Sequence, residues 1–180
     1  VPIQAGDDDI LHAMRRGYTA AAYRELIAKI RERIPSVSIA TDIIVGFPGE
    51  TEVQFQNTYQ LLADLRMDVA HLARYSPRTG TFSARKLEDN VPDKVKMDRF
   101  RRLETLQEEI ASEINARLLG KTVSVLFEEQ KRGRWRGRTP TNKLVFVESE
   151  QDLLGQERAV RIEWTGPWSL IGALDASPPG

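Results

Sequence analysis

The chain has 180 residues, of which 41% are hydrophobic, enough for one large core or two small ones. Its 26 basic and 26 acidic side chains cancel, so any affinity for nucleic acid must come from local clusters of charge. The lack of cysteine excludes disulfides, zinc–thiolate sites and iron–sulfur ligation by this chain. No apolar run is long enough for a membrane span, which predicts a cytoplasmic protein without a membrane partner.

Helix and strand patterns alternate in the first part of the chain. Apolar residues at helical spacing, among them Leu26 and Ile34, predict a helix over residues 20–34 with Thr19 as its N-cap. The run 37–47 is rich in β-branched residues and ends in a glycine and proline turn. This pattern predicts a strand that is buried on both faces.

A second helix and a second strand follow the same pattern. Thr51 and Gln54 have the spacing of a capping box, which predicts a helix that ends near residue 66. Residues 68–75 predict a short strand. The order helix, strand, helix, strand is typical of parallel βαβ units in an α/β fold. Two such strands are too few to close a (β/α) barrel, so we expect part of one.

The pattern changes near Gly120. A turn-rich connector over residues 76–92 precedes a long helix that is predicted from Asp93 to about Leu118, with Gly120 suited to its C-terminal end. Beyond it the apolar period changes from that of a helix to that of a strand. Short runs separated by glycine-bearing turns predict a small β-barrel, over residues 121–129, 144–149, 157–164 and 168–174. The predicted domains are 1–118 and 119–174, followed by a tail at 175–180.

Residues 131–143 are strongly basic and include no acid. Guanidinium groups bind phosphates, an indole can stack on a base, and hydroxyl and amide groups can reach sugar or base edges. The predicted RNA-binding residues are Arg134, Trp135, Arg136, Arg138, Thr141, Asn142 and Lys143. The alternative is a solvated hairpin, in which alternating arginines point outward only because a barrel needs a polar exterior.

The turn after the first predicted strand is a second candidate site. Gly46 and Gly49 would let a ligand approach the backbone closely, although both could serve only the turn between strand and helix. Asp42 lies within the strand, so its carboxylate must be paired or must face a polar interior. His12 and His71 share no ligand spacing with other residues, so no metal site is predicted.

Four stretches of the sequence resemble, in this order, the radical S-adenosylmethionine methylthiotransferases: "VPIQAGDDDILHAMRRGYT", "TDIIVGFPGETE", "YSPRTGT" and "GRTPTNKLVFV". The resemblance covers residues 1–174. It implies an α/β fold class in which the C-terminal part of a (β/α) radical S-adenosylmethionine barrel is followed by a small all-β barrel, the TRAM domain. Residues 137–143 are similar to the branch of the family that makes 2-methylthio-N6-dimethylallyladenosine in tRNA.

The resemblance also implies an activity for the complete enzyme. The family are transferases that add a methylthio group with S-adenosylmethionine and two 4Fe–4S clusters, which cysteines hold. Because this chain has none of those cysteines, we expect it to bind but not to catalyse, with no catalytic residue of its own. The implied substrate is C2 of the prenylated adenosine beside the anticodon, and the implied partner is the anticodon stem-loop of tRNA. The alternatives are methylthiolation of a ribosomal protein and a non-catalytic RNA-binding module.

The resemblance further implies which residues contact the cofactor. The later strands of such barrels present backbone and apolar groups to the adenosyl part of S-adenosylmethionine. The implied cofactor-binding residues are Gln4, Ile44, Gly46 and Gly49. A partial barrel also leaves an unpaired strand edge, which predicts an edge-paired or domain-swapped dimer of this chain.

Overall fold

The computed structural model describes residues 1–175, so all but the first residue of the predicted tail lies outside the described residues. The chain divides into two compact units, Val1–Gln107 and Glu108–Gly180. Helix α5 (Asp93–Ala116) runs through this division. The domain limits expected from the sequence, 1–118 and 119–174, remain predictions. Within residues 1–175, no helix is both long and apolar enough to cross a membrane.

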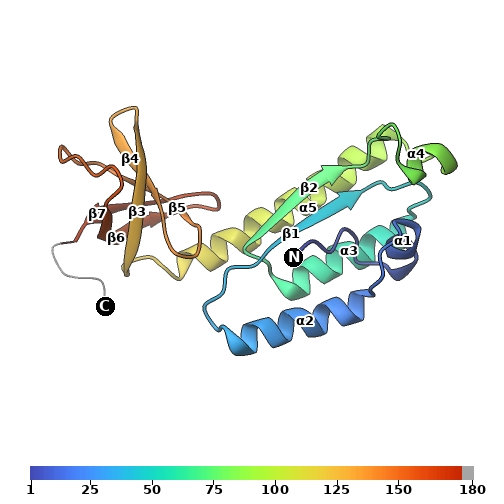
Figure 1. Ribbon diagram of the computed structural model, residues 1–180, viewed down its shortest axis with the longest axis horizontal. Coiled ribbons are helices and arrows are strands. Elements are labelled where there is room, and N and C mark those ends of the chain that lie inside the picture. The colour runs from blue at the N-terminus through green and yellow to red at the C-terminus, as the bar shows by residue number, and fades with distance from the viewer. Residues whose placement is uncertain (176–180) are drawn as a thin grey trace. The chain divides into compact units, whose positions relative to one another are not determined.

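The first unit contains a two-stranded parallel sheet with helices around it (Figure 1). The strands run in register, with Ile43 opposite Leu72, which confirms the predicted parallel pairing. Gln4 adds a single parallel bridge to Ile43, so the N-terminal segment lies beside the first strand. The elements of this unit before α5 are α1 (Asp8–Ala13), α2 (Ala20–Arg33), β1 (Ala40–Val45), α3 (Glu52–Leu65), β2 (Val69–Arg74) and α4 (Phe82–Lys86).

Side-chain caps explain where the helices of the first unit begin. Thr19 Oγ1 accepts a hydrogen bond from the amide of Ala22 at the start of α2. Thr51 and Gln54 form the predicted capping box at the start of α3. Helix α4 was not predicted, since its five residues are too few to show a periodic pattern; Thr81 caps it.

Two expectations about burial are wrong in this unit. Leu26 and Ile34 of the predicted apolar stripe are 44% and 54% exposed, because α2 buries mainly Tyr23 and Ile27. Strand β1 is not buried on both faces. Alternate residues such as Ile43 are buried, whereas Asp42 between them is exposed.

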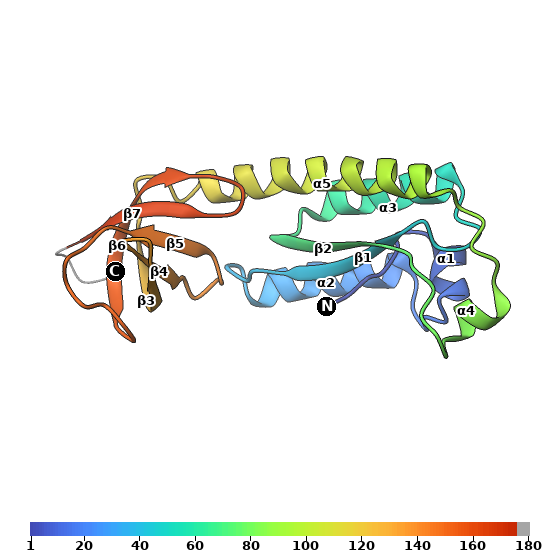
Figure 2. The ribbon, with the colours of Figure 1, turned by 90° about the horizontal axis from the view of Figure 1, so that it is seen from above.

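The two faces of the sheet have different surroundings. Helices α3 and α5 lie on one side of β1 and β2 (Figure 2). Phe55 and Leu62 of α3 and Leu103 of α5 are almost fully buried, as are the inward residues of β1. Burial of such side chains contributes about 1.5–3 kcal/mol each, which makes this the core that holds the sheet in place. The residues of β1 that alternate with this core are less buried: Asp42 is exposed and Ile44 is partly buried.

The second unit is a closed five-stranded barrel with the strand order β3-β4-β5-β7-β6, which confirms the predicted small all-β barrel. Its inner residues form one apolar cluster that includes Phe127, Val147 and Val160. Strand β4 was not predicted as a strand, because its basic sequence hides its alternation. The strands are β3 (Thr122–Lys131), β4 (Arg134–Arg138), β5 (Leu144–Val147), β6 (Glu157–Thr165) and β7 (Leu170–Leu174).

The end of α5 is fixed to the barrel within the second unit. The side-chain amide of Asn115 donates to the carbonyl of Gly166 over 2.8 Å, and the amide of Gly120 donates to the carbonyl of Ile162 over 2.8 Å. Gly120 has the positive φ of 76° expected of a residue after a helix, although the helix itself ends at Ala116. These bonds join the helix end to strand β6 and to the turn that follows it.

Candidate functional site

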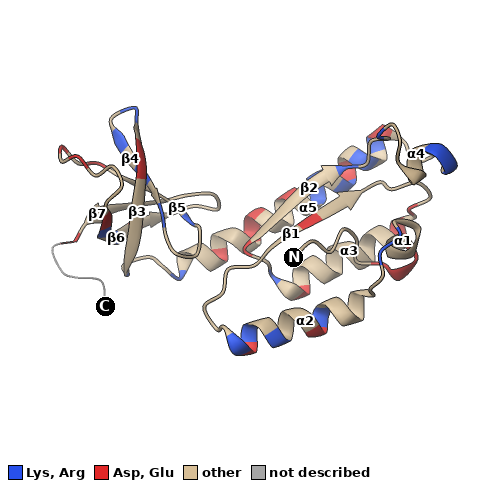
Figure 3. Ribbon diagram, viewed as in Figure 1, with Lys and Arg blue, Asp and Glu red and all other residues tan. Residues whose placement is uncertain are grey.

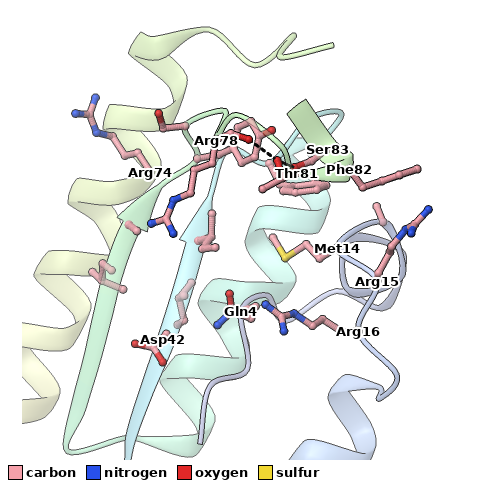
Figure 4. A pocket seen from close by; sticks show the side chains of 18 of the residues that line it. Gln4, Met14, Arg15, Arg16, Asp42, Arg74, Arg78, Thr81, Phe82 and Ser83 are labelled. Carbon is pink, nitrogen blue, oxygen red and sulfur yellow. Dashed lines mark hydrogen bonds between the residues drawn. The ribbon is translucent and has the colours of Figure 1, made fainter. Parts of the chain in front are cut away.

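The first unit has a cavity of about 570 Å³, and its lining includes Asp42 and Ile44 of β1. Its lining comes from Gln4, the end of α1, both strands, and the segment from Tyr75 to Ser83 (Figure 4). Apolar and aromatic side chains such as Ile44 and Phe47 line it together with arginines. Its size lies within the range of about 300–1,000 Å³ that is typical of small-molecule sites.

Gln4 is held in an uncommon conformation at this cavity. Its side chain faces the cavity (Figure 4), and the residue is 8% exposed with a φ of 73°. Two hydrogen bonds to β1 fix its backbone, from the amide of Gln4 to the carbonyl of Asp42 and from the amide of Ile44 to the carbonyl of Gln4, each over 2.9 Å. Left-handed backbone at a non-glycine residue costs on the order of 1 kcal/mol and is frequent at functional sites. These two backbone hydrogen bonds therefore hold the side-chain amide of Gln4 beside the apolar Ile44.

The structure separates the four residues that the resemblance implied for the cofactor. Gln4 and Ile44 both line the cavity, whereas Gly46 and Gly49 are absent from its lining. A Cβ on Gly46 would lie 2.3 Å from Cγ of Lys96, so this side of the glycine is filled by the protein and not open to a ligand. The amide of Gly49 donates to the side-chain oxygen of Asn90 over 2.7 Å. Gly46 therefore serves the packing of the turn, whereas Gly49 is exposed and a Cβ on it would meet no other atom within 4 Å.

A buried ion pair between Glu50 and Arg99 stabilises the glycine turn after β1. Glu50 Oε2 accepts hydrogen bonds from the amide of Gly46 over 2.8 Å and from Nη1 of Arg99 over 2.7 Å. The side chains of Arg99 and Glu50 are only 4% and 1% exposed. Burial raises the pKa of the Glu50 carboxyl, although the Gly46 amide and Arg99 act in the opposite direction. This pair was not predicted from the sequence, since the two residues lie 49 positions apart and follow no shared period.

A second ion pair supports the same turn. The ammonium of Lys96 lies 2.6 Å from a carboxylate oxygen of Asp89, and the lysine side chain is 3% exposed. The same ammonium lies 5.5 Å from the centre of the Tyr75 ring, and Tyr75 lines the cavity. Lys96 therefore connects α5 both to the glycine turn and to the cavity wall.

The arginines of the predicted RNA-binding segment lie on the outside of the barrel. Along β4 the arginines alternate with the buried Trp135 and Gly137. Each arginine has an acidic partner on a neighbouring part of the barrel: Arg134 with Glu148 at 2.8 Å, Arg136 with Glu129 at 3.0 Å and Arg138 with Glu128 at 3.5 Å. Figure 3 shows the acidic stretch of β3 beside basic β4. The acids that are missing from residues 131–143 are thus supplied across the sheet.

Trp135 lies in the apolar core of the barrel and is 6% exposed. The expectation that its indole stacks on a base is therefore wrong for this conformation, because its ring faces are covered by the barrel core. Side chains of a strand alternate between its two faces, so Trp135, which lies between the outward Arg134 and Arg136, points into the barrel. Exposed indoles are found instead at Trp164 and Trp168, which are 50% and 55% exposed and were not singled out from the sequence.

The remaining predicted RNA contacts form a tight loop between β4 and β5. The hydroxyl of Thr139 accepts from the amide of Lys143 over 3.0 Å and lies 3.0 Å from the hydroxyl of Thr141. Asn142 has a φ of 62°, and its side-chain oxygen accepts from Arg138 over 3.0 Å. These bonds give the loop one defined shape next to the end of β4.

The chain supplies no set of metal ligands in its described part. No group of three or more His, Cys, Asp or Glu side chains within residues 1–175 could hold a metal ion. The full sequence also has no cysteine, the residue that binds iron–sulfur clusters.

Comparison with known proteins assigns both units to families. The family model of the Radical SAM superfamily matches residues 1–62, and that of the TRAM domain matches residues 116–174. The fold therefore combines part of a radical SAM α/β domain with a TRAM barrel. Three of the four stretches on which the resemblance was based lie within these matches, and the stretch at residues 75–81 lies between them.

Three similar proteins are each named tRNA-2-methylthio-N(6)-dimethylallyladenosine synthase. The protein from Chloroflexus aurantiacus is 53% identical over 96% of this chain, that from a Roseiflexus species is 53% identical over 98%, and that from Dehalococcoides mccartyi strain CBDB1 is 46% identical over 97%. The matched part is 38%, 38% and 42% of those proteins, so the chain spans about two fifths of their length. With both family models matched in this order and this degree of identity, the chain belongs to the radical S-adenosylmethionine methylthiotransferase family.

Proposed function

We propose that the chain is the binding portion of a tRNA methylthiotransferase, which adds a methylthio group to C2 of the prenylated adenosine beside the anticodon. The observation that carries this proposal is the identity of about half of all residues, across both units, with proteins named for that product. The first unit would bind cofactor and target base, and the barrel would bind the RNA around it. The chain alone should bind without catalysing, because it has no cysteine for a cluster.

The cavity of the first unit fits the adenosyl part of S-adenosylmethionine. Ile44 offers an apolar surface for a flat ring, and the amide of Gln4 can donate and accept hydrogen bonds beside it. Bound together with an iron–sulfur cluster, S-adenosylmethionine supplies the radical chemistry of this superfamily. The ion pair of Glu50 and Arg99 keeps the neighbouring turn in place, so that β1 ends at a fixed position.

The barrel offers a polar outer face for the RNA backbone. Arg136 and Arg138 are only partly exposed and are paired with Glu129 and Glu128 at the surface. Surface pairs of this kind contribute about 0–1 kcal/mol, so a phosphate can replace the carboxylate at small cost. Arg134 and the residues Thr141, Asn142 and Lys143 of the adjoining loop would extend the same contact. Because the ion pairs of Arg136 and Arg138 are weak, these arginines are available to bind RNA phosphates.

The barrel contact is tested by binding an anticodon stem-loop RNA to the chain. Arg136→Ala together with Arg138→Ala should weaken binding and reduce its salt dependence, because phosphate contacts release counterions. The control is Arg158→Ala together with Arg161→Ala, which removes two exposed arginines from β6. Equal affinity of the two double variants would remove β4 from the RNA contact.

Two further expectations accompany this proposal. A protein that modifies tRNA would act in the cytoplasm, where tRNA is found. Strand β2 pairs with β1, and most of its residues are partly or fully exposed, so an edge-paired or domain-swapped dimer remains a prediction. Sedimentation of the chain over a range of concentrations tests the dimer, and a monomer at every concentration would exclude it.

A further inference from the structure

We propose that Arg16 and Arg78 bind backbone phosphates of the RNA at the cavity of the first unit, next to the base that is to be modified. This inference rests on the proposed function and adds a phosphate site in the first unit to the contact at β4. The cavity would then bind the RNA backbone as well as the base that is modified.

The two arginines reach the cavity from different segments. Arg16 lies in the turn after α1, where its amide donates to the carbonyl of Leu11 over 2.9 Å. Arg78 lies in the segment between β2 and α4. Both side chains extend toward the hollow that Gln4 faces (Figure 4). Two cationic groups from separate segments therefore face the same cavity.

A third arginine shapes the rim of the same cavity. The guanidinium carbon of Arg15 lies 3.5 Å from the centre of the Phe82 ring, so the two planar groups are in contact. The backbone of Arg15 has a φ of 59°, and its amide donates to the carbonyl of His12. Arg15 is thereby tied to α4, and Arg16 beside it remains directed to the cavity.

The charge of the cavity is unbalanced. Four arginines line it, Arg15, Arg16, Arg74 and Arg78, whereas Asp42 is its single acidic residue. None of the four makes an ion pair within the described residues 1–175, in contrast to the arginines of β4, each of which has a glutamate. Clustered cations without partners raise the positive potential of a concave surface and attract anions from solution. The most available cations of the candidate sites are thus in the cavity.

The sign of this charge distinguishes RNA from the cofactor. S-adenosylmethionine carries a sulfonium and an ammonium against one carboxylate, so an excess of arginines does not favour it as a whole. RNA carries one negative charge at each phosphate, and a guanidinium binds a phosphate with two parallel hydrogen bonds. A target nucleotide in the cavity would bring its own phosphates to the rim, where Arg16 and Arg78 can reach them.

The test uses the whole chain and a fluorescent anticodon stem-loop RNA. Fluorescence anisotropy over a range of salt concentrations gives the slope of log K against log salt, which changes by about 0.7–0.9 for each phosphate contact. We expect Arg16→Ala with Arg78→Ala to reduce the steepness of this slope by about 1.4–1.8, since two contacts are lost, and to weaken binding at least about 10-fold at low salt. Arg16→Lys with Arg78→Lys should restore the slope, because the charge is kept.

The matched control is Lys29→Ala with Arg33→Ala. Both residues are exposed on α2 and line no described cavity, so the net charge changes equally without touching the site. If the unmodified chain fails to bind the RNA, the proposed function itself is at fault. If it binds and the cavity variant behaves like the control, this inference is wrong.

A calorimetric titration with S-adenosylmethionine separates the cofactor from the RNA. We expect the cavity variant to bind the cofactor as the unmodified chain does. Loss of cofactor binding with RNA binding intact would show that the arginines hold the cofactor carboxylate, and it would overturn the phosphate assignment.

Discussion

Arg99→Ala should strongly destabilise the first unit, because it leaves the buried carboxylate of Glu50 without its cationic partner. The two side chains are 2.7 Å apart and almost fully buried. Removing one member of a buried ion pair costs about 3–5 kcal/mol, since an uncompensated charge remains. Arg99 also donates to the carbonyl of Glu50 over 3.1 Å, so a second bond is lost. We therefore expect a loss of at least about 3 kcal/mol at alkaline pH.

The loss should depend on pH in a defined direction. Burial already raises the pKa of Glu50, and removing Arg99 takes away a group that opposes this shift. A carboxyl whose pKa is raised in the folded state binds its proton more tightly there than in the unfolded chain. Its contribution to stability is complete below the usual pKa of a glutamate and is lost as the pH rises through the raised pKa. Arg99→Ala should therefore be least stable at pH 8 and should recover part of the loss at pH 5.

The distribution of aromatic residues allows each unit to be followed separately. All four tyrosines lie in the first unit, and all three tryptophans lie in the second. Tryptophan fluorescence during urea unfolding thus reports the barrel, whereas the tyrosine signal in near-ultraviolet circular dichroism reports the first unit, once the tryptophan bands are subtracted. We expect the variant to shift the tyrosine transition and to leave the tryptophan transition in place.

Arg102→Ala is the control, since it removes the same charge from the same helix at the surface. The Arg102 side chain is 37% exposed and lies 2.7 Å from a carboxylate oxygen of the exposed Glu52. A pair of this kind contributes at most about 1 kcal/mol. The reasoning fails if Arg99→Ala costs no more than this control at pH 8, or if its effect does not fall as the pH is lowered.

Three substitutions test the roles of single residues. Trp135→Ala should destabilise the barrel by about 3–5 kcal/mol in urea unfolding, whereas Trp168→Ala should have little effect, because only Trp135 is in the core; similar costs would contradict the burial of Trp135. Gly46→Ala should destabilise the first unit and broaden amide spectra of the turn, because the added carbon would meet Lys96 at 2.3 Å and the φ is 71°; an unchanged melting temperature would refute this. Thr51→Ala should lower the free energy of unfolding by about 1 kcal/mol, followed by circular dichroism, because the N-cap of α3 is lost; an unchanged free energy would argue against the capping box.

The fold was predictable where local chemistry decides it. The N-caps of α2 and α3 were found because Thr19 and Thr51 act within their own first turns. The parallel pairing of β1 with β2 followed from the order of the elements. Strand β4 was missed, since three arginines on its outer face conceal the inward Trp135 and Gly137. Its identity as a strand depends on pairing with β3 and β5, which no local signal carries.

The candidate site was only partly predictable for the same reason. Gln4 and Ile44, which the family resemblance implied as cofactor contacts, do line the cavity. The partners of the glycine turn come from α5, about fifty residues further along, so the pair of Glu50 with Arg99 was hidden. Residues 131–143 contain no acid of their own, whereas their acidic partners lie on the neighbouring strand β3 and after β5. Pairing across strands is a property of the fold and not of the segment.

Nucleoside mass spectrometry of tRNA tests the central claim most directly. Cells from which the gene encoding this chain is deleted should lack 2-methylthio-N6-dimethylallyladenosine and accumulate the prenylated adenosine without the methylthio group, and the restored gene should reverse both changes. Ribosomal proteins from the same cells should keep their masses. Persistence of the methylthio nucleoside in the deletion strain, or a ribosomal protein that loses the mass of a methylthio group, would contradict the account.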